Sequence, residues 1–248
     1  MPEGPTLVIL KEKLQPFIGQ LVVSASGYVK GFDPEILIDH TIKDIKSWGK
    51  YLIMLFDGFS IKVHFGLFGS YKINERGRNR ASLQVVCNDG EINFYISKVK
   101  LIEQPIDEVF DWSTDVMSSG FDIRKARKKL QLKPERMICD ALLDQEIFAG
   151  SGNIVKNEVL FRTRVHPESK IAFLPANKQR EIIKETLNFC NDFYRWRKAK
   201  ILREHLEAHE QTICPRDHVN FIKADLGKTK RHCYYCTLCQ KKYDNKTF

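Results

Sequence analysis

The sequence predicts an α+β protein in which an N-terminal β-sandwich with one leading helix is followed by a helical domain and a small cysteine-rich end. Three observations support this prediction. In the first half, apolar and β-branched runs flank turn-forming residues. In the second half, apolar residues recur at helical spacing, and four cysteines crowd residues 214–239.

Residues 1–112 make up the predicted β-rich domain. Its opening segment, PTLVILKEKLQPFIG, places Leu7, Leu10 and Leu14 on one helical face and reaches a glycine stop at Gly19. We therefore expect a single helix ahead of the strands.

Two hairpins are predicted in the rest of this domain. KYLIMLF and FSIKVHFG flank Asp57-Gly58, and ASLQVVC and EINFYIS flank Asn88-Asp89-Gly90. Such turn residues tolerate the positive φ angles that tight hairpins need, and the flanking Val, Ile, Phe and Tyr favour half-buried strands. Two packed sheets are the expected result.

The pattern changes after a polar segment, DWSTDVMSSGFD, from which residues 113–122 are predicted as a linker. The helical domain is predicted over residues 123–210. Its main helical stretches are residues 123–145 and 177–210, and residues 211–248 form the basic, cysteine-rich end.

Composition narrows the possible partners. Lys and Arg number 40 against 31 acids, a net charge of +9, which favours a polyanion such as nucleic acid. No apolar run is long enough to span a membrane, and the N-terminus lacks the pattern of a signal peptide. We therefore expect no membrane partner and a cytoplasmic, nucleoid-associated location.

The C-terminal cysteines predict one structural zinc ion. Cys236 and Cys239 form a C-x2-C knuckle, and Cys214 supplies an upstream thiol. The fourth ligand is predicted to be His218, four residues after Cys214, with Asp217 as the second candidate.

Other cysteines have different expected roles. Cys233 could compete with Cys236 for the metal, whereas Cys87, Cys139 and Cys190 are expected to be buried small hydrophobes. The stretch between the two ligand pairs is long enough for a β-hairpin, and its excess of lysine and arginine suits backbone phosphates.

A glycine-asparagine segment, AGSGN, separates two apolar helical runs. Gly150 and Gly152 permit unusual backbone angles, and Asn153 is predicted as the N-cap of the second helix. A helix N-terminus with an amide side chain suits a phosphate. A plain capped helix pair explains the same residues equally well.

The first residues, MPEGPTL, also allow two interpretations. Pro2 and Glu3 could simply begin a helix. If Met1 is removed, however, Pro2 becomes a secondary amine of moderate basicity with a carboxyl group beside it, which is a nucleophile next to an acid.

Four motifs in order resemble the formamidopyrimidine-DNA glycosylase / endonuclease VIII family: MPEGP at the start, GKYL at 49–52, AGSGNIVKNEVLF at 149–161 and RHCYYCTLCQ at 231–240. The resemblance implies a β-sandwich, a helical domain with a helix-two-turn-helix motif, and a zinc finger. It also implies a monomer that binds damaged DNA between two lobes.

The resemblance assigns roles where the motifs match. Pro2 matches the nucleophile and Glu3 its acid partner, and Lys50, Asn153 and Arg231 match residues that hold phosphates.

Two further residues correspond less firmly to the family pattern. His64, in HFGLFG, lies where the family often has a histidine near the DNA backbone, or it is an ordinary strand-end histidine. Leu67, with Phe68 beside it, lies where family members fill the void left by a flipped base, although both could be ordinary strand residues.

The departures point to one branch of the family. EGP at the start is like endonuclease VIII, the DPRRFG motif of the purine branch is replaced by YISKVKL, and little room is left for a long lesion-capping loop. The implied function is a bifunctional DNA glycosylase and AP lyase acting on oxidised pyrimidines. It would form a Schiff base at Pro2 and carry out β- and δ-elimination; the alternative is a non-catalytic, zinc-dependent DNA-binding protein.

Overall fold

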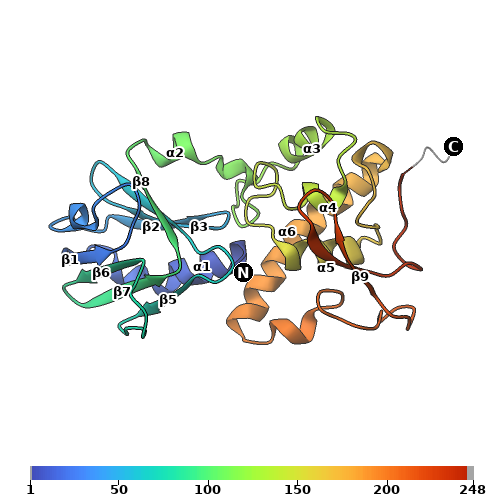
Figure 1. The fold of residues 1–248 in the computed structure, drawn as a ribbon. Coiled ribbons are helices and arrows are strands. Elements are labelled where there is room, and N and C mark those ends of the chain that lie inside the picture. The colour runs from blue at the N-terminus through green and yellow to red at the C-terminus, as the bar shows by residue number, and fades with distance from the viewer. Residues whose placement is uncertain (1, 245–248) are drawn as a thin grey trace. The chain divides into compact units, whose positions relative to one another are not determined.

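The structure, a computed structural model, describes residues 2–244 of the chain. The chain divides into two compact units, Met1–Asp111 (unit 1) and Trp112–Phe248 (unit 2). Figure 1 labels the elements of both, and each unit is described by itself.

Unit 1 begins with the predicted helix, α1 (Gly4–Lys13), which is followed by a short 3-10 turn (Gln15–Phe17). The predicted leucine face of α1 is buried against the sheet, and the chain leaves the turn through Gly19 at φ 85°. A left-handed φ of this kind favours glycine, which explains the stop read from the sequence.

Two antiparallel four-stranded sheets form the rest of unit 1, in the orders β1-β6-β7-β5 and β2-β3-β4-β8. The strands are β1 (Val22–Gly27), β2 (Asp44–Trp48), β3 (Tyr51–Leu55), β4 (Ser60–His64), β5 (Ser70–Ile73), β6 (Leu83–Cys87), β7 (Gly90–Tyr95) and β8 (Lys98–Ile102). Side chains of both sheets and of α1 share one apolar core, and a short helix, α2 (Ile106–Val109), ends the unit. The predicted β-sandwich is confirmed.

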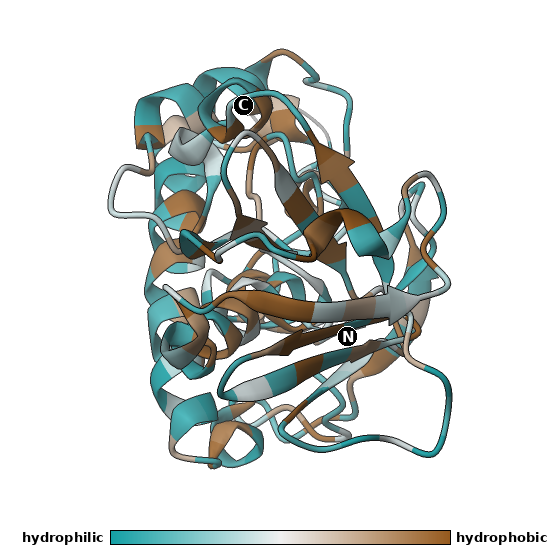
Figure 2. Ribbon diagram, turned by 90° about the vertical axis from the view of Figure 1, so that its left-hand side faces the viewer, coloured by the Kyte–Doolittle hydropathy of each residue, from teal (hydrophilic) through white to brown (hydrophobic). Residues whose placement is uncertain are grey.

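Both predicted hairpins are present. Strands β3 and β4 pair around Asp57-Gly58, with Gly58 at φ 83°, and β6 and β7 pair around the second turn, with Cys87 opposite Gly90. Figure 2 shows apolar residues interspersed with polar ones along the strands, as expected for sheets buried on one face.

Unit 2 is helical, but its first predicted stretch is divided. The helices are α3 (Ile123–Gln131), α4 (Ile138–Ala141), α5 (Asn153–Arg162) and α6 (Ala176–Lys198). Pro134 lies between α3 and α4, where it removes a backbone donor and prevents one continuous helix. The second stretch begins near its predicted start, and α6 ends before Lys200, whose φ is 64°.

The segment predicted as a linker is packed rather than free. Val116 is 3% exposed and belongs to the core of unit 2, and the N–H of Val116 donates to the carbonyl of Ala149. These contacts attach residues after Trp112 to the turn that precedes α5. Short polar residues therefore mark the border of the units without forming a flexible connector.

The C-terminal segment contributes a two-stranded hairpin, β9 (Ile222–Leu226) and β10 (Arg231–Tyr235), which belongs to unit 2. β10 lies against α5. Among the residues that the structure describes, no helix is long and apolar enough to cross a membrane.

Candidate nucleic-acid and metal sites

The N-terminal pair lies at the start of α1. Glu3 is the residue that precedes the helix and is 1% exposed, whereas Pro2 is half-buried. The hydroxyl of Thr6 accepts from the N–H of Glu3 (3.0 Å) and donates to its carbonyl (2.6 Å), which fixes the backbone there. The helix start therefore holds the first residues in one orientation, and the two interpretations of the sequence are compatible.

Lys50 and His64 come together on the sheet β2-β3-β4-β8. Lys50 lies in the tight turn between β2 and β3, and its carbonyl oxygen is 3.2 Å from Nδ1 of His64. His64 pairs with Tyr51 across β3 and β4, and their rings are 5.1 Å apart. The pairing therefore places one lysine and one histidine at the same end of this sheet.

The same sheet carries lysines on two neighbouring strands. Lys62 faces Lys100 across β4 and β8, and His64 faces Lys98. Burial, and then the charge of Lys100, lower the pKa of Lys62, which lies over the ring of Tyr51. Cations on neighbouring strands form a positive surface suited to an anion.

Leu67 and Phe68 project from the turn that joins β4 to β5. They are 54% and 78% exposed, and the N–H of Gly69 closes the turn on the carbonyl of Phe65 at 2.8 Å. A Cβ on Gly69 would lie 2.2 Å from that carbonyl oxygen, so this tight turn requires glycine.

A third apolar residue at this corner was missed by the sequence analysis. Ile96 is 58% exposed and has a φ of 50°, which is strained for a β-branched residue. It follows Tyr95, which pairs with Ser70, and it lies two residues before Lys98, which pairs with His64. The register therefore brings Ile96 to the end of the sandwich that carries the Leu67 turn.

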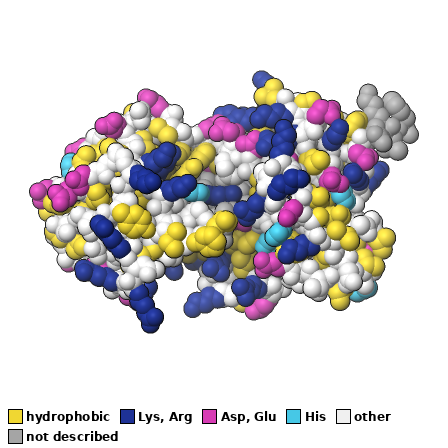
Figure 3. Space-filling model, viewed as in Figure 1, with side chains coloured by type: hydrophobic (Ala, Val, Ile, Leu, Met, Phe, Trp, Pro, Cys, Tyr) yellow, Lys and Arg dark blue, Asp and Glu magenta, His cyan; other side chains and the backbone are white. Residues whose placement is uncertain are grey.

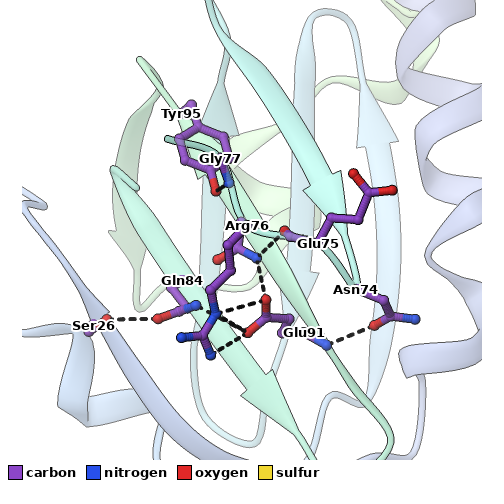
Figure 4. Close-up of polar contacts among 9 residues, drawn as sticks. Ser26, Asn74, Glu75, Arg76, Gly77, Gln84, Glu91 and Tyr95 are labelled. Carbon is purple, nitrogen blue, oxygen red and sulfur yellow. Dashed lines mark hydrogen bonds and ion pairs between the residues drawn. The ribbon is translucent and has the colours of Figure 1, made fainter. Parts of the chain in front are cut away.

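The arginine-rich loop that follows β5 is fixed by hydrogen bonds to strand β7 of the sheet β1-β6-β7-β5 (Figure 4). Arg76 donates to both carboxylate oxygens of Glu91 at 2.8–3.0 Å, and the N–H of Gly77 donates to the hydroxyl of Tyr95 at 2.6 Å. The hydrogen bonds from Arg76 hold the pKa of Glu91 below its usual range. Beyond this clamp, Arg78 remains exposed.

In unit 2, the N-cap of α5 is Gly152, in an extended conformation, and Asn153, which was predicted as the N-cap, is instead the first helical residue. Gln145 holds the segment that leads into this helix, because its side-chain oxygen accepts from the N–H of Gly150. The φ angle of Gly150 is 99°. The side-chain oxygen of Asn153 and the hydroxyl of Ser151 are buried without a hydrogen-bond partner among the described residues. The hydroxyl of Ser151 can donate to an anion at this helix N-terminus, whereas the side-chain oxygen of Asn153 can only accept, so the amide of Asn153 would have to present its Nδ2 to a phosphate.

Arg231 opens β10 and pairs with Leu226 across the hairpin. Asp140 secures the adjoining turn, because its carboxylate accepts from the N–H groups of Lys228 (2.9 Å) and Thr229 (3.2 Å). Asp140 is 3% exposed, so the turn that precedes Arg231 is tied to the helical part of unit 2.

Four potential metal ligands converge at the open end of the hairpin. They are Cys214, Asp217, Cys236 and Cys239, whose ligand atoms all lie within 4.8 Å of one another. The Oδ2 atom of Asp217 is 3.2 Å from Sγ of Cys236 and 3.5 Å from Sγ of Cys214. Three sulfurs and one carboxylate oxygen at this separation suit a tetrahedral zinc ion.

The structure gives Asp217 the place expected for His218. Asp217 follows Cys214 by three residues, the same spacing that separates Cys236 from Cys239. His218 is exposed, has a φ of 55°, and its N–H donates to the carbonyl of Cys214 (2.9 Å), so it closes the knuckle outside the cluster.

Cys233, the other competitor for the metal, is also outside the cluster and belongs to the main core of unit 2. At the cluster itself, burial raises the pKa of Cys236 and that of Cys239, the latter to about 12. Hydrogen bonds from the thiols of Cys239 and Cys236 hold the pKa of Asp217 below its usual range. Losing the thiol protons therefore needs a cation at this site, as metal binding supplies.

Positive charge is present on both units. Figure 3 shows Lys and Arg side chains over the viewed face of each, in keeping with the net charge of +9. The two units therefore carry anion-binding positions, exposed apolar side chains and a cluster of four potential metal ligands.

Two family models match the chain. Residues 1–98 match the formamidopyrimidine-DNA glycosylase N-terminal domain, and residues 113–191 match the formamidopyrimidine-DNA glycosylase H2TH domain. Together they cover most of both units.

Curated relatives agree with these matches. Endonuclease 8-like 3 of Mus musculus is 34% identical over 206 residues, which are 79% of this chain and 34% of the relative. The chain thus spans about a third of that relative's length. Formamidopyrimidine-DNA glycosylase of Mycoplasma genitalium is 28% identical, with 97% of this chain and 96% of the relative covered.

Solved structures share the fold. A complex of the Lactococcus lactis Fpg protein with DNA containing an oxidised pyrimidine matches with a TM-score of 0.86 at 22% identity, covering 97% of this chain and 100% of that chain. A viral DNA glycosylase matches with a TM-score of 0.83 at 20% identity, covering 96% and 100%.

Proposed function

Because this chain belongs to the formamidopyrimidine-DNA glycosylase / endonuclease VIII family, we propose that it is a DNA glycosylase of base excision repair with an additional AP lyase activity. The observation that carries the proposal is the Pro2-Glu3 pair fixed at the start of α1, in a chain that also offers the phosphate-binding positions described above. A protein that only bound DNA would need neither residue of the pair.

Pro2 is the proposed nucleophile, once removal of Met1 has freed its nitrogen. A base inside a duplex is out of reach, so the damaged nucleotide must first leave the stack. The lone pair of the proline nitrogen then forms a bond to C1′ while the bond from C1′ to the base breaks. The base departs with the bonding electrons and takes up the proton that the proline nitrogen loses, so the nitrogen regains a lone pair.

Glu3 is the proposed acid for the next step. It donates a proton to O4′, the bond between C1′ and O4′ breaks, and the nitrogen lone pair completes a cationic iminium. A secondary amine is suited to this because its adduct has no N–H to lose. The cation acidifies C2′, so loss of a C2′ proton expels the 3′ phosphate, and a second elimination expels the 5′ phosphate.

The DNA backbone is held by residues on both units. Lys50 and the nearby His64 serve unit 1, and Asn153 and Arg231 serve unit 2. Contacts of this kind position the DNA and carry no sequence information. The protein is proposed to act as a monomer.

The exposed apolar corner, formed by Leu67, Phe68 and Ile96, is the proposed contact with bases around the flipped nucleotide. Exposed apolar side chains next to cations suit a surface that meets both stacked bases and phosphates. Oxidised pyrimidines are the proposed lesions, on the strength of the endonuclease VIII-like start and the relatives of that name.

Zinc is the proposed structural ion, held by Cys214, Asp217, Cys236 and Cys239. When bound, it supplies cross-links between the two ends of the hairpin segment and takes no part in the chemistry. The four ligands fix the chain on either side of β9 and β10.

Borohydride trapping tests the proposal directly. The protein is incubated with a duplex that carries one oxidised pyrimidine, or one abasic site, and sodium borohydride is added to reduce any iminium. We expect a covalent protein–DNA adduct whose modified peptide contains Pro2. Mass spectrometry of the free protein should also find Pro2 as the amino terminus.

Two variants serve as controls. Pro2→Gly should form far less adduct on the lesion duplex, because the imine of a primary amine can lose its N–H proton and is then no longer a cation. Lys50→Ala should chiefly weaken DNA binding. Tight, zinc-dependent DNA binding without any adduct on either substrate would instead support the non-catalytic DNA-binding protein.

A further inference from the structure

A lysine is buried between α5 and the hairpin. Lys156 lies in the first turn of α5 and is 1% exposed. Its Nζ atom is 2.9 Å from the carbonyl oxygen of His232, 3.1 Å from Sγ of Cys233 and 3.5 Å from the carbonyl oxygen of Arg231. All three partners belong to β10.

A buried ammonium group needs a compensating anion, because an unpaired charge in a protein interior is very costly. The described partners of Nζ are two carbonyls and one sulfur, and none is a carboxylate. The nearest acid along the helix, Glu158, uses its oxygens on the N–H groups of residues 207–209. Of these three partners, the sulfur of Cys233 is the one that can carry a negative charge; it also lies 3.6 Å from the carbonyl oxygen of Arg231.

The surroundings of Cys233 favour its thiolate. A hydrogen bond from Cys139 and the charge of Lys156 lower the pKa of Cys233 to about 6, in spite of burial. The same pairing raises the pKa of Cys139. Cys139 therefore stays a thiol, and its S–H group donates a hydrogen bond to the Cys233 sulfur. Cys233 is 0% and Cys139 is 2% exposed, so water does not screen this arrangement.

A neighbouring residue fixes the same strand. Asn157 donates from Nδ2 to the carbonyl of His232 (3.2 Å) and accepts at Oδ1 from the N–H of Tyr234 (3.0 Å). Its Nδ2 also lies 2.9 Å from the carbonyl of Asn153, the first residue of the helix. One helical turn thus connects the start of α5 to the strand that begins at Arg231.

We propose that Lys156 and Cys233 form a buried ammonium–thiolate pair that positions Arg231 relative to Asn153. Lys156 is a positioning residue: it fixes the main chain of Arg231 and acts on DNA only through that side chain. The proposal rests on the proposed function to the extent that Arg231 and Asn153 hold phosphates. It also means that α5, as well as the metal cluster, determines where the hairpin lies.

Hydrogen exchange in the free protein tests the structural half without DNA. Lys156→Met keeps the length and apolar stem of the side chain and removes the charge. We expect peptides covering residues 228–235 to exchange at least tenfold faster in the variant, with the zinc content unchanged. Cys233→Ser, a smaller perturbation that also removes the thiolate, should change the same peptides. Unchanged exchange in both variants would overturn the proposal.

Binding to a duplex with a tetrahydrofuran abasic analogue tests the functional half. Loss of one phosphate contact lowers the slope of log Kd against log salt by about 0.9. Arg231→Ala and Lys156→Met should each show such a decrease. The double variant should resemble Arg231→Ala alone, because both substitutions remove the same phosphate contact, that of Arg231. Additive losses would mean that Lys156 does not act through Arg231, and the proposal would fail.

A matched control and the Arg231 variant separate the possible failures. Lys178→Met removes another lysine of unit 2 that donates to a carbonyl, that of Thr163 at 3.1 Å, and should leave the salt slope and hairpin exchange unchanged. If Arg231→Ala leaves the slope unchanged, Arg231 holds no phosphate and that part of the proposed function fails. Faster exchange in Lys156→Met would still establish the Lys156–Cys233 link to the strand.

Discussion

Acid should destabilise unit 2 through one buried histidine. His209 is 9% exposed, its Nδ1 atom is 3.2 Å from Nδ2 of Asn157, and its ring packs edge-on against Tyr234 with centroids 5.5 Å apart. Burial lowers the pKa of His209 to about 4, and it outweighs the opposing influence of Glu210. The ring is therefore neutral in the folded protein near pH 7.

The sign of the effect follows from proton counting. An unfolded histidine has a pKa of 6.5, so between pH 6.5 and about 4 the unfolded chain binds a proton that the folded chain does not. Stability is complete above that window and falls as the pH falls through it. For these two pKa values, lowering the pH from 7 to 5 costs about 2 kcal/mol.

Urea unfolding at several pH values measures this loss. Other groups also titrate, so the informative quantity is the difference between the wild type and His209→Gln, which has no imidazole to protonate. The variant should lose about 2 kcal/mol less than the wild type between pH 7 and pH 5. His205→Gln, in the same unit, is the control for replacing a histidine. Parallel pH profiles for wild type and His209→Gln would refute the reasoning.

Three further outcomes are expected. Asp217→Ala should reduce the zinc content measured by elemental analysis well below one ion per chain, whereas His218→Ala should retain it; the reverse result would restore the histidine as ligand. Asp140→Ala should cost about 2 kcal/mol in urea unfolding, since two part-buried N–H groups and a hydroxyl lose a charged acceptor, and a cost below about 0.5 kcal/mol would contradict its anchoring role. Asn153→Ala should weaken binding to abasic DNA with little change in the salt slope, because a neutral amide releases no counterion, and it should leave the zinc content unchanged.

The sequence was most informative where a local rule decides the structure. The Asp57-Gly58 turn, the second hairpin turn and the glycine after α1 each need backbone angles that few residues adopt, and all lie where they were predicted. The change from strand to helix in mid-chain was equally readable, because its periodicity extends over many residues.

Contacts between residues far apart in the chain could not be predicted from the sequence. The exposure of Ile96 depends on how β7 and β8 continue into two different sheets, and its left-handed φ has no sequence signal. Lysine is among the residues least often buried, so nothing in the sequence indicated that Lys156 of α5 would lie in the interior. Preference for an imidazole ligand favoured His218, whereas the spacing of the knuckle places Asp217 with the thiols.

The start of α5 explains why this helix carries so many polar residues inside a protein. Asn153, Lys156, Asn157 and Glu158 are all at most 9% exposed, although such residues normally face water. Lys156 and Asn157 bind the strand β10, Glu158 accepts from the N–H groups of residues 207–209, and the side-chain oxygen of Asn153 has no hydrogen-bond partner among the described residues. A single turn thereby connects an anion site, the arginine-bearing hairpin and the segment after α6. Replacing Lys156, Asn157 or Glu158 by an apolar residue would leave its partners unsatisfied, so the cost should exceed that of the lost contact itself.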